Sequence, residues 1–147
     1  MGSWQHRLLL SQVLERTLIA FPGGGSFVGA GRFDADNFGA IPRWKARYTL
    51  DWSKDAWQAT YALQWIDSLS EAGGELFAGS SPHIPSVVYH DLSAMWAAKN
   101  DLSIRLTINN LLDQDPPVVV NADTANTDVS TYRLLGRSFL LRWSYRW

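Results

Sequence analysis

The chain has 147 residues, no cysteine and a formal net charge of −1. These values exclude disulfides and thiolate metal sites, and no charge excess points to a nucleic-acid partner. No apolar run approaches the roughly 18 residues that a membrane helix needs, but the strands of a membrane barrel alternate and escape that criterion. The distinctive count is tryptophan, with 8 residues in this length.

Residues 1–41 are expected to form an irregular or partly helical segment. Apolar residues between Trp4 and Phe21 are spaced roughly as on one face of a helix. The favoured interpretation is nevertheless a displaced segment without its native neighbours, and the helix is the alternative. Pro22 and the three glycines after it end any regular element. The Gly-rich stretch 26–41 is interpreted as loop, with a short strand at 26–32.

From residue 43 onward, apolar and polar residues alternate with a period of two. Residues 44–52 and 57–65 each carry Trp, Ala, Tyr, Leu and Trp at alternate positions. Alternate side chains of a strand point to opposite faces, so each run has one apolar and one polar face. The polar link Lys54-Asp55 predicts a hairpin between them.

The tryptophans at the two ends of each run are eight residues apart. On tilted strands this spacing separates them by about 20 Å along a membrane normal. Aromatic girdles at both edges of an apolar band are typical of membrane β-barrels. The alternative is a soluble sandwich with a tryptophan-rich core.

Three further strands are predicted, at residues 87–99, 102–109 and 137–147. Asn100-Asp101 forms a short turn, whereas residues 67–86 and 113–135 are expected to be long polar loops. Connections therefore alternate between short and long, as in barrels with short periplasmic turns and long outer loops. The sequence predicts an all-β fold, an antiparallel up-and-down meander of about five strands.

The two parities of these strands predict two surfaces. The aromatic residues expected at membrane interfaces are Trp44, Trp52, Trp57, Trp65, Trp96, Trp143 and Trp147. The basic residues expected to face the lumen are Arg43, Lys45, Arg47, Arg105, Arg142 and Arg146. They are interpreted as pairing with acidic groups of a missing part or with Asp51 and Asp91. The alternative is an electropositive wall that attracts anionic ligands.

Several stretches together resemble the C-terminal end of TonB-dependent outer-membrane receptors. The residues that carry the resemblance are Asn110, Leu111, Leu112, Asp113, Pro116, Pro117, Gly136 and Arg137, with Tyr132 before the last two. Leu112 stands where the family usually has Phe. The stretch 36–45, with Gly39, Pro42 and Lys45, looks like the start of a strand in the same family. The resemblance covers about residues 31–147.

The resemblance implies that residues 42–147 are the C-terminal strands of a transmembrane β-barrel that is incomplete on its own. The expected location is the outer membrane of a Gram-negative cell. The expected partners are outer-membrane lipid, the remaining barrel and plug, and TonB through the missing N-terminal part. The intact receptor would import a scarce nutrient, such as a ferric siderophore, a vitamin or a saccharide. We expect the chain to be a segment of a longer protein, since about eight strands are the fewest that close a barrel.

No catalytic residue, metal site or cofactor is assigned. His6, His83 and His90 show no ligand spacing, and the Gly-rich stretches lack the Lys-Ser/Thr of a phosphate loop. Asp113 and Asp115 are interpreted as polar loop residues in preference to cation ligands. Two alternative functions remain, a soluble carbohydrate-binding β-sheet module and a small self-assembling outer-membrane barrel.

Overall fold

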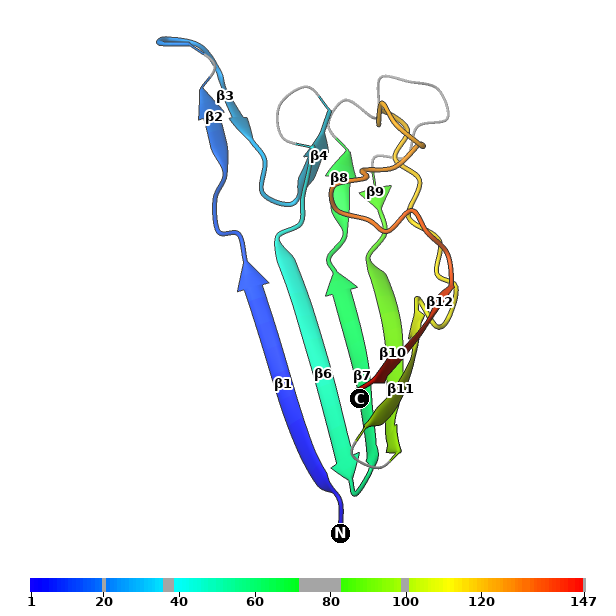
Figure 1. Cartoon of the computed structure of the whole chain (residues 1–147). Coiled ribbons are helices and arrows are strands. Elements are labelled where there is room, and N and C mark those ends of the chain that lie inside the picture. The colour runs from blue at the N-terminus through cyan, green and yellow to red at the C-terminus, as the bar shows by residue number, and fades with distance from the viewer. Residues whose placement is uncertain (20, 36–38, 72–82, 99–100, 147) are drawn as a thin grey trace.

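The fold is dominated by one open antiparallel sheet, seen in a computed structural model (Figure 1). The structure describes residues 1–19, 21–35, 39–71, 83–98 and 101–146. The sheet has six strands in the order β1-β6-β7-β10-β11-β12. They are β1 (Ser3–Gln12), β6 (Trp44–Lys54), β7 (Trp57–Ile66), β10 (Val87–Ala98), β11 (Leu102–Asn109) and β12 (Ser138–Tyr145). Every neighbouring pair is antiparallel, which confirms the predicted all-β meander.

The pairing register sorts the side chains into two faces. Trp52 pairs with Trp4 on one side and Ala59 on the other, and Trp96 pairs with Trp57 and Ile104. The same parity continues to Trp143 on β12. We call this side the aromatic face and the opposite side the polar face. A shift of one residue in any pairing would exchange the two faces of that strand.

The sheet has two different ends. At the turn end, Asp55 and Ala56 link β6 to β7, and Asp55 has a positive φ of 51°. Asp tolerates this left-handed conformation better than most residues. The tight turn is confirmed, one residue later than expected. Asn100 of the second predicted turn lies outside the described residues. The opposite end, which carries the longer connections, is called the loop end (Figure 1).

Strand β1 corrects the expectation for residues 1–41. Instead of an irregular or helical segment, residues 3–12 form a sixth strand that pairs with β6 over its whole length. Leu9 hid the alternation, because it is apolar and yet points to the polar face, as its partner Arg47 does. Along the chain, β1 is followed by β2 (Thr17–Ile19), which pairs with β3 (Ser26–Val28) in a separate two-stranded sheet. No helix of the described chain is long and apolar enough to cross a membrane.

The two long connections are more ordered than polar loops. Near the loop end, β4 (Arg32–Asp34) lies between β5 (Gly39–Ile41) and β8 (Leu69–Glu71), and β8 pairs with β9 (His83–Ile84). A hydrophobic core forms here from segments far apart in the chain. Its buried members are Phe33, Ala40, Ile66, Leu69, Ile84, Val87, Tyr89, Val119 and Tyr132. The expectation of long polar loops at 67–86 and 113–135 is therefore corrected in part, because β8 and β9 lie in the first loop and both loops bury apolar side chains on the polar side of the sheet. Residues 72–82 of the first loop lie outside the described residues.

Candidate functional site

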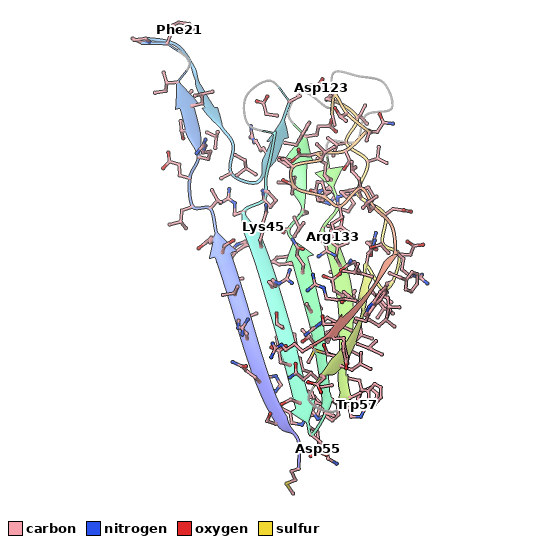
Figure 2. The ribbon with its side chains drawn as sticks, viewed as in Figure 1. Phe21, Lys45, Asp55, Trp57, Asp123 and Arg133 are labelled. Atoms are coloured by element: carbon pink, nitrogen blue, oxygen red, sulfur yellow. The ribbon has the colours of Figure 1, made fainter. Side chains whose placement is uncertain are left out.

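The connection from β11 to β12, residues 110–137, crosses the loop end of the polar face. We call this connection the strap (Figure 2). Val119 and Tyr132 anchor it by inserting into the core. Two carboxylates, one at the end of β8 and one in the strap, add polar anchors. Glu71 accepts the Asn121 N–H at 2.7 Å, and Asp128 accepts the Ala40 N–H at 3.1 Å.

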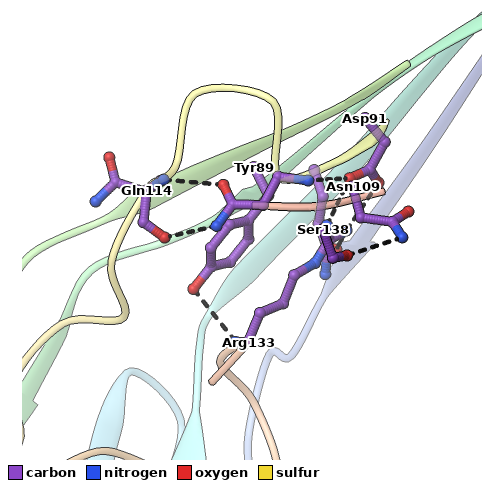
Figure 3. Close-up of polar contacts among 8 residues, drawn as sticks. Tyr89, Asp91, Asn109, Gln114, Arg133 and Ser138 are labelled. Carbon is purple, nitrogen blue, oxygen red and sulfur yellow. Dashed lines mark hydrogen bonds and ion pairs between the residues drawn. The ribbon is translucent and has the colours of Figure 1, made fainter. Parts of the chain in front are cut away.

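Arg133 of the strap forms an ion pair with Asp91 on β10 (Figure 3). Its two terminal nitrogens donate to the two carboxylate oxygens at 2.7 and 3.0 Å. This bidentate geometry is the strongest that an arginine and a carboxylate can adopt. The Asn110 N–H also donates to Asp91 at 3.0 Å. Asp91 therefore joins the start and the later part of the strap to the centre of the sheet.

Two further residues of the polar face complete the surroundings of Arg133. Its Nη2 also donates to Gln64 Oε1 at 2.9 Å, and its guanidinium lies 4.9 Å from the centre of the Tyr89 ring. The backbone N–H of Arg133 donates to the Tyr89 hydroxyl at 3.3 Å. A cation over an aromatic face is attracted by the negative face of the ring. Sequence reasoning missed Arg133, because it lies in a segment without strand periodicity.

The residues of the family motif form a clasp where the strap leaves β11 and reaches β12. The side chain of Asn110 brackets Gln114, accepting its N–H and donating to its carbonyl, both at 2.9 Å. Asp113 accepts the Arg137 N–H at 2.6 Å. A Cβ on Gly136 would lie 2.8 Å from that Asp113 oxygen, which explains glycine at this position.

The other motif residues have smaller roles in the same region. Pro117 is buried and its carbonyl accepts the hydroxyl of Thr127 at 2.8 Å. The Leu111 N–H donates to the His90 carbonyl. Leu112 is exposed, and Pro116 is half-buried. The motif therefore has a structural role, fixing the position at which β12 joins the sheet.

A pocket of about 430 Å³ opens between the clasp, the later strap and the polar face. Its size is within the range of small-molecule sites. The lining residues are Arg47, Asp91, Asn109, Asn110, Arg133, Leu134, Leu135, Gly136 and Ser138. With Asp91 engaged by Arg133, the pocket keeps one excess positive charge, on the exposed Arg47. The arrangement suits an anionic or polar ligand.

Tyr132 is a residue of the strap, and its burial in the loop-end core changes its acidity. Desolvation, with Asp128 and Tyr89 nearby, raises the pKa of the Tyr132 phenol far above its usual value near 10. Its hydroxyl has no hydrogen-bond partner in the described chain. The core therefore holds this phenol in its neutral form.

The basic residues predicted to face the lumen do not form one continuous wall. Lys45 and Arg47 lie towards the loop end on β6, whereas Arg105 and Arg142 lie opposite each other towards the turn end. All four project from the polar face. Arg43 lies just before β6 and donates to the carbonyl of Ala30 at 3.4 Å. The N–H of Arg146, just past β12, donates to the Asp101 carbonyl at 2.9 Å. Their exposure to a lumen stays a prediction.

The predicted interface aromatics share the aromatic face wherever the structure describes them. Trp57 and Trp96 stack at the turn end with ring centres 6.0 Å apart, and Trp52 lies 6.1 Å from Trp4. The register puts Trp44 and Trp65 near the loop end and Trp143 near the turn end. Trp147 lies outside the described residues. Sequence reasoning missed Trp4. The available signal was the spacing of two residues between Trp4, His6 and Leu8, which is that of one face of a strand.

Two histidines on the aromatic face are each paired with a tyrosine. His6 Nδ1 lies 2.7 Å from the Tyr48 hydroxyl, and His90 Nδ1 lies 2.6 Å from the Tyr61 hydroxyl. Each pair satisfies two polar groups within an otherwise apolar surface. No cluster of residues suited to a metal ion occurs in the described chain. The absence of catalytic function stays a prediction.

Comparison with known proteins gives one structural relationship. No protein-family model and no curated protein sequence matches the chain. Among solved structures, it is similar to the closed form of the ferric-catecholate import receptor Fiu from Escherichia coli K12. The TM-score is 0.58, the identity is 16%, and the match covers 97% of this chain and 18% of that receptor. At this identity, the similarity establishes the fold alone. The chain spans less than a fifth of the length of the receptor it matches.

Proposed function

We propose that this chain is part of the β-barrel of a TonB-dependent receptor, which imports a scarce nutrient across a Gram-negative outer membrane. The observation that carries the proposal is the division of one sheet into an aromatic and a polar face. The fold of the ferric-catecholate receptor supports the same assignment. The C-terminal motif adds support, since its residues form the clasp that attaches the last strand.

The aromatic face has the composition of a surface that contacts lipid. Leu8, Leu141 and Phe139 on this face are 67%, 61% and 66% exposed. A soluble protein would need a second layer to cover such a patch. Its tryptophans lie near both ends, as the aromatic girdles of membrane barrels do. Its two histidines are hydrogen-bonded to tyrosines, so their polar groups are satisfied within this face. A soluble carbohydrate-binding module gives no reason for this arrangement.

The two outer strands of the sheet need neighbours. In lipid, the unpaired backbone groups on the free edges of β1 and β12 would be very unfavourable. We propose that further strands of a longer barrel pair with both edges, and that a plug and TonB act through parts outside this chain. The 18% coverage of the receptor is consistent with that proposal.

The polar face and the strap would then line the ligand pathway. We propose that the pocket beside Arg47 contacts the imported compound at the outer side of the barrel. The class of compound, whether ferric siderophore, vitamin or saccharide, depends on segments beyond this sheet. An electropositive pathway favours the anionic members of that group.

An immunoblot of fractionated cell envelopes tests the proposal. The antibody would recognise residues 138–147, and the expected result is a band in the outer-membrane fraction, several times heavier than 16.5 kDa. A 16.5 kDa band in the soluble fraction would refute the membrane assignment. A band of that size in the outer membrane would refute the longer barrel and support self-assembly of short chains.

A further inference from the structure

Two arginines of neighbouring strands lie directly opposite each other near the turn end of the polar face. Arg105 on β11 pairs with Arg142 on β12 in the register of the sheet. Directly opposite residues have Cβ atoms about 5 Å apart, and like charges in that position repel. The register therefore places two arginines at adjacent positions on one surface, and the guanidinium of Arg105 lies over β10, where it contacts Ser93 and Met95.

Neither arginine has an acidic partner in the described chain. Arg105 donates only to the hydroxyl of Ser93 at 3.4 Å and to the sulfur of Met95 at 3.1 Å, and a thioether is a weak acceptor. No carboxylate of the described residues forms an ion pair with either arginine. The closest acidic residue along β11 is Asp101, four positions or about 13 Å away.

The surrounding positions of the polar face are all neutral. The residues beside the pair on β10, β11 and β12 are Ser93, Met95, Ala97, Ser103, Thr107, Leu140 and Ser144. Arg133 on the same face shows the opposite case, since a carboxylate engages both its terminal nitrogens. The pair thus has two guanidinium groups that each offer several N–H donors, and an excess of positive charge. No carboxylate of the described residues accepts from either group.

We propose that Arg105 and Arg142 form a site for one oxyanion, a carboxylate or phosphate group held between their guanidinium groups. Planar guanidinium forks match the geometry of both groups. The oxyanion comes from an acidic side chain of another protein segment on the polar face, or from a dissolved phosphate. The proposal does not depend on transport, because it needs only the register of β11 and β12.

Thermal unfolding of the native protein that contains this chain, in neutral detergent micelles, tests the site. The Tm would be measured by circular dichroism in sodium chloride, sodium acetate and sodium phosphate at equal ionic strength. Acetate or phosphate should raise the Tm saturably above its value in chloride, because a specific ligand stabilises the folded state. A stronger effect of acetate indicates a protein carboxylate as the natural occupant, and a stronger effect of phosphate indicates a dissolved anion.

Three variants separate binding from general screening. Arg142→Gln should weaken the apparent anion affinity about tenfold or more, and should raise the Tm in dilute chloride by removing the repulsion. Arg142→Glu should raise that Tm further and abolish the anion response. Arg146→Gln, an exposed position just past β12, should leave the response unchanged. Equal Tm values in the three salts, or an unchanged response in Arg142→Gln, would overturn the proposed site while leaving the transport proposal standing.

Discussion

Two adjacent leucines on β1 provide a sharp test of which face meets lipid. Leu8 lies on the aromatic face and Leu9 on the polar face, and their side chains are similarly exposed at 67% and 58%. Leu8 pairs with Tyr48, which lies four residues from Trp44 and from Trp52. Leu8 therefore lies at mid-height between the two aromatic levels, where a bilayer would be most apolar.

The two substitutions to arginine have different expected costs. Arginine at the midplane of the lipid face of a barrel costs about 2–4 kcal/mol, so Leu8→Arg should lower the free energy of unfolding by that amount. Leu9→Arg would face Arg47 on the polar side. Repulsion between opposite like charges there costs about 0.2–1 kcal/mol. The difference between the variants should thus be at least about 1 kcal/mol.

The assay is urea unfolding of the native protein that contains this chain, in phospholipid vesicles, followed by tryptophan fluorescence. Equal costs for the two variants would refute the assignment of the aromatic face to lipid, since an open sheet in water exposes both leucines alike. A larger cost for Leu9→Arg would refute it more strongly, because the polar face would then be the covered one.

Three further predictions concern the strap. Arg133→Ala removes the bidentate partner of Asp91 and should lower the free energy of unfolding by about 1.5–3 kcal/mol. The measurement is a urea titration, and a loss below about 0.5 kcal/mol would show that the ion pair does not hold the strap. Gly136→Ala brings a Cβ against Asp113 and should lower the free energy of unfolding by about 1–3 kcal/mol. In an Asp113→Ala background the loss should be much smaller, and additive losses in this double-mutant cycle would contradict the clasp. Tyr132 has a raised pKa in the folded chain, so its contribution to stability is complete below pH ~10 and declines as the pH rises further. Tyr132→Phe should therefore lose less stability than the parent chain between pH ~10 and ~12, and identical pH profiles would exclude an effect of this phenol.

The predictable part of the fold rests on local alternation. The runs that begin at Trp44 and Trp57 revealed their two faces, because successive side chains of a strand point in opposite directions whatever the partner strand is. The register then placed both runs as expected. β1 was missed for a local reason too, since Leu9 gave its polar side an apolar residue and His6 gave its apolar side a polar one.

The candidate site was only partly predictable. The motif residues Asn110, Asp113 and Gly136 could be selected by resemblance, but their meeting in a clasp depends on the path of the strap. Arg133 carried no signal, because its partner Asp91 lies 42 residues earlier in the chain. Lys45, Arg47, Arg105 and Arg142 share the polar face, yet parity does not tell how far apart they lie on the sheet.

The sequence by itself determined the class of fold, the two-faced character of its strands and the nature of each face. These properties follow from a period of two between neighbours in the chain. The tertiary structure decided that β1 joins the sheet, that the strap packs on the core, and that Arg105 lies opposite Arg142 in the strand register. Each of these depends on pairing between segments distant in the chain, where a shift of two residues would keep the faces and change every contact.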